Sequence, residues 1–363
     1  MQKLHKRICL GLLSMAFAGT VMFASNSALA KPLVIAEQGS FAAGGTVVQT
    51  AGEFDYTKPT NPAGQTLHGD HAYVFYQRPV HAKKLPLVFL NGAGQSAKTW
   101  ESTPDGRDGF QNIFLRKGYS TYLVDQPRRG RAGQSTVAAN VPAATIDQLW
   151  YSNFRLGNWP DFYPGVQFPQ DKASLEQFFR QMTPNTGAYD EGVIAKAMAA
   201  TFAKAGDGIL VTHSQGGGPG WRTVMLSDKV KAVAAFEPGS GFVFPKGEVP
   251  DPLPSTSPFG ALGASAVSME DFIKLTKVPI IIYYGDYIPA EMTDEWNKDN
   301  WRVRLIMARK FADAINRHGG DATVVHLPEI GIYGNTHFLF SDLNNVEIAE
   351  HFAKWLKEKH LDK

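Results

Sequence analysis

Short apolar runs alternate with stretches of helical periodicity from residue 85 to the end of this chain. Runs typical of fully buried strands occur at 85–90, 120–125, 208–212, 230–236, 278–284 and 322–327. Apolar residues at helical spacing follow several of these runs, at 100–117, 221–226, 301–317 and 345–359. Repeated strand–helix units of this kind predict an α/β fold with a mostly parallel central sheet and helices on both faces.

The segment before residue 85 has a different pattern. Strands are predicted at 33–36, 45–50 and 71–77, with turns at Gly44-Gly45 and at 59–69. These strands are too closely spaced for helical crossovers, so we expect them to form antiparallel N-terminal strands of the sheet.

Two segments interrupt the strand–helix alternation. Residues 137–200 are rich in Trp, Tyr and Phe among prolines and glycines, and contain helical patterns at 172–182 and 191–204. Residues 238–268 are rich in proline. Insertions between the strands of an α/β sheet lie over its carboxyl edge, where ligands bind. We therefore interpret residues 137–200 as a cap and residues 238–268 as a rim loop. The aromatic residues either line an apolar substrate cavity or attach the cap to the sheet.

Residues 1–30 have the pattern of a secretory signal peptide. Basic residues stand at the start, an apolar run follows at 8–24, and Ala28-Leu29-Ala30 provides a small-x-small cleavage site. Small and polar residues dilute the apolar run and no basic stop-transfer flank follows, so no stable membrane anchor is predicted. We therefore expect a secreted or periplasmic protein whose folded part is residues 31–363.

Charge and cysteine content exclude several kinds of partner and chemistry. After residue 30 the chain carries 33 Lys+Arg and 34 Asp+Glu, so no excess of positive charge indicates nucleic acid or an acidic lipid surface as partner. The single cysteine, Cys9, lies in the predicted signal, which excludes a thiol enzyme. No His-Glu-x-x-His or comparable ligand cluster occurs, and no nucleotide-binding glycine motif is present. We therefore expect neither a metal nor a cofactor.

An apolar strand leads directly into a serine and then into glycines that open a helix. The junction reads Thr212-His213-Ser214-Gln215-Gly216. A serine in this position lies on a sharp strand-to-helix turn, the nucleophile elbow, which exposes its hydroxyl at the edge of the sheet. Thr212 stands where the usual Gly-x-Ser-x-Gly pattern has its first glycine. We predict that Ser214 is a catalytic nucleophile; the alternative is a buried serine beside a glycine-rich helix start.

A histidine and an acid are placed to complete a triad with this serine. A serine hydroxyl needs a base within hydrogen-bond reach, and the base needs an acid that orients it. His337 lies in the loop after the last predicted strand, where the base belongs when the triad runs serine, acid, histidine along the chain. His213 is interpreted as a packing residue that faces the other side of its strand. Glu237 and Asp286 each follow a predicted strand, and spacing leaves both open as the acid.

Two backbone N–H groups are predicted to form an oxyanion hole. One belongs to Gln215, at the N-terminus of a helix, where the dipole also favours negative charge. The other belongs to Ala93, in the glycine-containing loop after the strand at 85–90. A basic cluster, Arg128-Arg129-Gly130-Arg131, follows the next strand and is either a solvated loop or a binding site for a substrate carboxylate.

Four motifs support a more specific interpretation: Ser214-Gln215-Gly216, Phe236-Glu237-Pro238-Gly239, Tyr284-Gly285-Asp286 and Gly334-Asn335-Thr336-His337-Phe338. Together they resemble a branch of secreted bacterial α/β-hydrolase esterases, over the chain from about residue 85 to the end apart from the cap. The resemblance implies an α/β-hydrolase fold and a Ser-Glu-His triad with the glutamate after the sixth strand. It therefore implies Glu237 as the acid and leaves Asp286 as a secondary polar residue.

The sequence thus predicts a serine carboxylesterase that cleaves small-molecule esters through an acyl-enzyme intermediate. Serine at position 214 excludes the epoxide hydrolases and dehalogenases of this fold, which need a carboxylate there. An amidase or peptidase using the same triad stays open, as does a ligand-binding protein that keeps the fold without catalysis. The sequence does not specify an oligomeric state.

Overall fold

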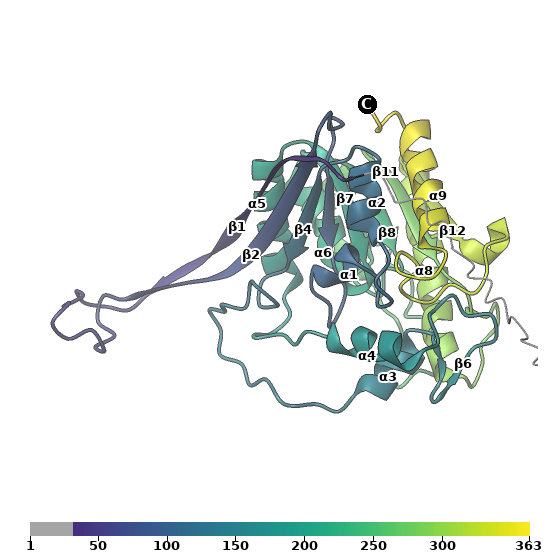
Figure 1. Ribbon diagram of the computed structural model, residues 1–363, viewed down its shortest axis with the longest axis horizontal. Coiled ribbons are helices and arrows are strands. Elements are labelled where there is room, and N and C mark those ends of the chain that lie inside the picture. The colour runs from purple at the N-terminus through teal and green to yellow at the C-terminus, as the bar shows by residue number, and fades with distance from the viewer. Residues whose placement is uncertain (1–31) are drawn as a thin grey trace, which may run out of the picture. The chain divides into compact units, whose positions relative to one another are not determined.

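An eight-stranded sheet forms the centre of the computed structural model, which describes residues 32–363 (Figure 1). The predicted signal peptide lies outside the described residues, and Leu33–Lys363 form one compact unit. In spatial order the strands are β1 (Ile35–Gln49), β2 (Thr66–Pro79), β4 (Thr121–Asp125), β3 (Leu87–Leu90), β7 (Gly208–His213), β8 (Val230–Phe236), β11 (Pro279–Tyr284) and β12 (Asp321–His326). β2 runs antiparallel to β1 and β4, and the remaining neighbours are parallel, as the sequence pattern predicts.

The register brings the ends of the central parallel strands to one edge. Leu90 of β3 pairs with Thr212 of β7, and His213 of β7 pairs with Phe236 of β8. Phe236 in turn pairs with Tyr283 of β11. The residues that follow these strand ends therefore lie side by side, although long stretches of sequence separate them.

Helices cover both faces of the sheet (Figure 1). One face carries α5 (Glu191–Ala205), α6 (Gly217–Leu226), α7 (Met269–Leu275) and α8 (Trp296–Arg317); the other carries α1 (Lys98–Glu101), α2 (Phe110–Arg116) and α9 (Asn345–Glu358). Each face of the sheet forms a hydrophobic core with its helices, and the side chains of β7 point to the two cores alternately. Leu210 packs with the first group of helices, and Ile209 and Val211 pack with the second. Within residues 32–363, no helix is long and apolar enough to cross a membrane.

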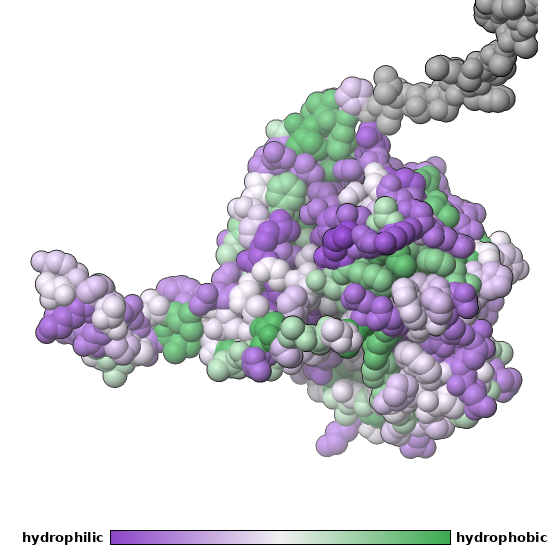
Figure 2. Space-filling model, turned by 60° about the horizontal axis from the view of Figure 1, so that its bottom comes forward, coloured by the Kyte–Doolittle hydropathy of each residue, from purple (hydrophilic) through white to green (hydrophobic). Residues whose placement is uncertain are grey.

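The N-terminal strands form a long hairpin that differs from the prediction. β1 is one continuous strand, and Gly44 and Gly45, predicted to form a turn, lie inside it with φ of 68° and 103°. A side chain at Gly45 would stand 2.8 Å from the Gly69 carbonyl oxygen of β2, so glycine allows close approach of the partner strand rather than a reversal of the chain. Beyond this point the hairpin projects from the sheet as a narrow arm (Figures 1 and 2).

The two predicted insertions have distinct structures. Residues 137–200 contain α3 (Asp147–Asn153), β5 (Gly157–Asn158), β6 (Asp161–Phe162) and α4 (Lys172–Arg180), followed by the start of α5. α3 and α4 lie beyond the sheet, at the bottom of Figure 1. α5, however, packs against β1, β2 and α6, so this part of the range expected for the cap covers the sheet instead. Residues 238–268 hold only the short strands β9 (Val243–Pro245) and β10 (Ser265–Val267).

Candidate active site

Ser214 lies on a strained turn at the end of β7. Its φ is 51°, in the left-handed region that non-glycine residues rarely adopt. The turn is possible because glycines surround it: a side-chain carbon at Gly92 would stand 2.6 Å from the Ser214 Cβ, and one at Gly216 would stand 2.9 Å from the Asn91 carbonyl oxygen. The side chain of Thr212, which departs from the usual pattern, packs where Gly220 leaves room, since a Cβ there would be 2.8 Å from the Thr212 Cγ2.

His337 and Glu237 form a fully buried hydrogen-bonded pair beside this turn. The His337 Nδ1 lies 2.8 Å from the Glu237 Oε2, and both side chains have no exposed surface. The His337 ring lies over Trp301, with ring centroids 4.1 Å apart, and stacks on Phe154 at 5.0 Å. Within the described residues the His337 Nε2 has no hydrogen-bond partner, so its bond to the Ser214 hydroxyl is not made in this structure.

A buried arginine completes this arrangement, and sequence reasoning missed it. Arg155 follows α3, has no exposed surface, and donates from its Nη2 to the Glu237 Oε1. Its Nε donates to the Asp286 carbonyl oxygen at 2.8 Å, and its guanidinium lies 4.9 Å from the centre of the Trp301 ring. The Gly285 backbone N–H also donates to the Glu237 Oε1, at 2.5 Å. The only sequence signal for this role was the position of Arg155 among the aromatic residues at 150–168.

These neighbours set the protonation states of the pair. Burial raises the pKa of Glu237, but the Arg155 charge and the hydrogen bond from His337 outweigh burial and lower that pKa to about 2. Burial lowers the pKa of His337, and Arg155 lowers it further, while Glu237 opposes both. The balance leaves the pKa of His337 below its usual value of 6.5, so at neutral pH the site holds a carboxylate and a neutral imidazole.

Asp286, the other acid left open by spacing, bonds elsewhere. Its Oδ2 accepts from the Gly334 N–H at 2.7 Å, and its Oδ1 accepts from the Tyr287 N–H at 2.6 Å. Asp342 similarly accepts from the backbone and hydroxyl of Thr336 at 2.7 and 2.8 Å. Both aspartates thus brace the loop that carries His337, and neither makes a hydrogen bond to its imidazole.

His213, interpreted from the sequence as a packing residue, is buried and also contacts the candidate base. Its Nε2 lies 3.0 Å from the His337 carbonyl oxygen, and the two rings are 4.4 Å apart. Burial holds the pKa of His213 well below its usual value. The ring therefore helps position the His337 backbone and carries no charge at neutral pH.

The predicted oxyanion loop is held by an arginine from the basic cluster. The Arg129 Nη1 donates to the Gly92 carbonyl at 2.5 Å, and its Nη2 donates to the Gln215 Oε1 at 3.0 Å. The Asn91 amide donates to the Gln95 carbonyl within the same loop. Among the described residues the Ala93 N–H has no acceptor, as an oxyanion donor requires before substrate binds.

The basic cluster is therefore neither a solvated loop nor an anion site as a unit. Arg128 forms a buried ion pair with Asp70 at 2.7 Å, and Arg131 pairs with Asp125 at 2.8 Å. Arg129 is only 1% exposed and is satisfied by neutral acceptors. The cluster forms ion pairs and supports the loop beside Ser214.

Two adjoining cavities open beside Ser214. A cavity of about 290 Å³ is lined by Ala93, Trp150, Asn153, Phe154, Ser214, Gln215, Gly239, Ser240, Phe259, Asn300, Trp301 and Arg304. A second, of about 410 Å³, shares Ala93, Trp150 and Gln215 with the first and extends along residues 142–147 and 182–185. The insertion thus contributes aromatic walls to both. Within residues 32–363 no group of three or more acidic, His or Cys side chains is placed to hold a metal ion.

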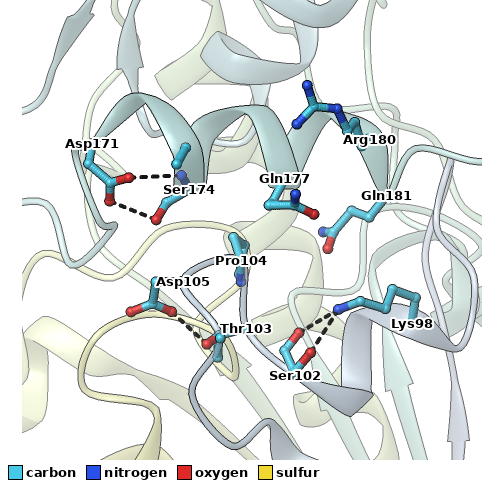
Figure 3. A pocket seen from close by; sticks show the side chains of 12 residues that line it. Lys98, Ser102, Thr103, Pro104, Asp105, Asp171, Ser174, Gln177, Arg180 and Gln181 are labelled. Carbon is cyan, nitrogen blue, oxygen red and sulfur yellow. Dashed lines mark hydrogen bonds between the residues drawn. The ribbon is translucent and has the colours of Figure 1, made fainter.

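A larger cavity, of about 640 Å³, lies apart from Ser214 and the two cavities beside it (Figure 3). It lies between α4 on one side and α1 with the loop after it on the other, and none of the predicted site residues lines it. Its polar side chains largely satisfy one another, as in the bonds from Lys98 to Ser102 and from Thr103 to Asp105 (Figure 3).

Comparison with known proteins agrees with this architecture. A solved structure described as that of a novel bacterial esterase is 29% identical in sequence, with a TM-score of 0.72, over 91% of this chain and 98% of that one. The chain has the α/β-hydrolase fold. The predicted fold class is therefore confirmed. A fungal protein named probable secreted lipase phiG (Fungal sp. strain ATCC 74256) is 27% identical over 303 residues, or 76% of this chain and 82% of the fungal protein. No family model matches the chain.

Replacement of Arg155 by Met should destabilise the protein strongly. The change leaves the Glu237 carboxylate buried without its cation, and breaking a buried ion pair from one side typically costs about 3–5 kcal/mol. The measurement is the free energy of unfolding by urea at pH 7. Arg309→Met, which removes an exposed pair with Glu329, should cost at most about 1 kcal/mol. Equal losses in the two variants would contradict this role of Arg155.

Proposed function

We propose that this protein is a serine hydrolase that cleaves carboxylic esters through an acyl-enzyme intermediate. The observation that carries the proposal is the meeting, at one edge of the sheet, of a serine on a strained turn with a buried pair of imidazole and carboxylate. The names of the two similar proteins, an esterase and a lipase, support the same reaction class.

In the first step the Ser214 Oγ attacks the ester carbonyl carbon. His337 accepts the serine proton at Nε2, the nitrogen that has no partner in the described residues. We propose that the hydrogen bond between these two side chains forms when substrate enters the cavity, because catalytic hydrogen bonds are often long before binding. Glu237 accepts a hydrogen bond from the Nδ1–H group and stabilises the imidazolium without taking its proton.

The tetrahedral intermediate places negative charge on the former carbonyl oxygen. The N–H groups of Ala93 and Gln215 are proposed to donate to that oxygen, since both residues line the same cavity as Ser214. Arg129 fixes both sides of this oxyanion hole by holding the Gly92 carbonyl and the Gln215 side chain. Fixed donors need no rearrangement as the charge develops.

The intermediate collapses when His337 returns its proton to the leaving alcohol. The acyl group is then bound to Ser214, and water enters where the alcohol was. His337 takes a proton from that water, which attacks the acyl carbon, and the acid leaves as serine regains its proton. No cofactor is needed at any step.

The proposal also covers the role of the cap and the cellular location of the protein. We propose that the part of the insertion lying beyond the sheet forms an aromatic cap, with Trp150 and Phe154 against the substrate, and that residues 238–268 form the rim. We also propose that residues 1–30 direct the protein to the periplasm or outside the cell. The name of the fungal relative, a secreted lipase, supports this location.

A fluorophosphonate probe tests the nucleophile. The probe should label the wild-type protein on one serine, and Ser214→Ala should abolish labelling because Ser214 is the serine on the strained turn beside the His337–Glu237 pair. Ser227→Ala, just after α6, is the matched control and should keep the label. Intact-protein mass spectrometry gives the readout. An unlabelled but folded wild-type protein would favour a ligand-binding protein without catalysis.

Substitution of the two acids distinguishes their roles. Glu237→Gln should lower kcat by about 10³- to 10⁴-fold, because an amide cannot orient and stabilise the imidazolium. Asp286→Asn, which alters only a brace of the loop, should lower kcat by less than about tenfold. Initial rates with p-nitrophenyl acetate provide the measurement. The opposite ranking would transfer the acid role to Asp286.

A further inference from the structure

Two arginines in the described part of the chain lack an acidic partner. The other eleven between residues 32 and 363 each lie within 4.0 Å of an Asp or Glu oxygen. The exceptions are Arg129 and Arg304, and both line the cavities beside Ser214. A guanidinium removed from water without a counter-charge costs free energy, so its presence in a cavity indicates a role.

Arg129 and Arg304 differ in how far their donors are satisfied. Arg129 donates from Nε and both terminal nitrogens to neutral acceptors. Arg304 donates only from Nη1, to the carbonyl and side-chain oxygens of Asn300. Within residues 32–363 its Nε and Nη2 have no acceptor. Its guanidinium lies 5.3 Å from the centre of the Trp301 ring, which orients its plane without using those donors.

The directions of the hydrogen bonds around Arg304 identify the side chain of Asn153 as a second source of free donors. Arginine can only donate, so the side-chain oxygen of Asn300 must face Arg304, at 2.6 Å from Nη1. The Asn300 amide nitrogen consequently donates to the Asn153 Oδ1, at 2.9 Å. This leaves the Asn153 NH₂ without an acceptor among the described residues. The chain of bonds thus ends in a free donor.

These donors share one cavity with the candidate nucleophile. Asn153, Arg304 and Ser214 all line the cavity of about 290 Å³, in which Arg304 is the only charged residue. The hydroxyl of Ser240, in the same lining, also makes no hydrogen bond within the described residues. Burial lowers the pKa of Arg304 to about 10, so the guanidinium is still charged at neutral pH. The cavity therefore offers several donors and a positive charge, and no carboxylate.

We propose that Arg304 and Asn153 form a carboxylate subsite, so that the preferred esters carry a carboxylate near the ester group. This inference rests on the proposed esterase function and names its substrate class. Guanidinium and carboxylate match in geometry and form two parallel charge-assisted hydrogen bonds. Because the cavity is at the small end of the range for ligand sites, the carboxylate and the ester carbonyl are separated by only a few atoms.

Two pairs of esters, matched in chain length, test the subsite on either side of the ester. Monomethyl glutarate is compared with methyl pentanoate, and 4-acetoxybutanoate with butyl acetate; each pair differs by one carboxylate in place of a methyl group. Wild-type kcat/KM, followed by acid release, should favour the charged member of at least one pair. Arg304→Gln should lower that charged-to-neutral ratio by about 10- to 100-fold, and Arg304→Lys should lower it less.

Arg309→Gln, on the same helix but paired with Glu329 at the surface, is the control and should leave the ratio unchanged. If Arg304→Gln lowered kcat/KM equally for both members of a pair, Arg304 would instead stabilise the oxyanion or the fold. That result would overturn the subsite. A wild-type protein without preference in either pair would overturn it as well.

A binding measurement separates this inference from the proposed function. Calorimetry with Ser214→Ala protein should show tighter binding of the charged member of the preferred pair than of its neutral partner, and Arg304→Gln in that background should remove the difference. Selective binding without any hydrolysis by the wild-type protein would overturn the esterase proposal and leave the subsite intact. Hydrolysis without selective binding would overturn the subsite alone.

Discussion

The buried contact between Arg155, Glu237 and His337 is the constraint on which the rest of this site depends. A carboxylate with no exposed surface is costly unless a cation and hydrogen bonds compensate it. Here Arg155 supplies the charge, the Gly285 N–H supplies a hydrogen bond, and His337 supplies the remaining donor. Because Arg155 comes from the insertion after β4, the segment that covers the sheet edge also keeps the candidate acid ionised.

The sequence predicted those features that repeat along the chain or lie at a strand end. Apolar runs identified the parallel strands, and the glycines around Ser214 indicated its turn. Arg155 was missed because its partners lie 82 and 131 residues away, and no local pattern reports such a pairing. The prediction of a turn at Gly44-Gly45 was wrong. Glycine is frequent in turns, but it also occurs where two strands approach each other closely, and the residue type alone does not distinguish these two uses.

Two arginines beside the candidate nucleophile differ in whether their charge is balanced. Behind the candidate nucleophile, the charge of Arg155 is balanced by Glu237, so the neutral imidazole is the form that burial favours. In front of it, Arg304 stands without a counter-charge in a cavity walled by aromatic residues. We propose that the first arrangement serves the proton transfers of ester cleavage and that the second distinguishes one ester from another.

The pH dependence of kcat/KM is the most direct test of this account. If His337 acts as the base in its buried, neutral form, activity toward a neutral ester should fall on the acid side with an inflection below pH 6.5, because burial and Arg155 disfavour the imidazolium. Activity should therefore persist in mildly acidic solution. An inflection at or above pH 6.5 would contradict the account, since Glu237 would then outweigh burial and Arg155.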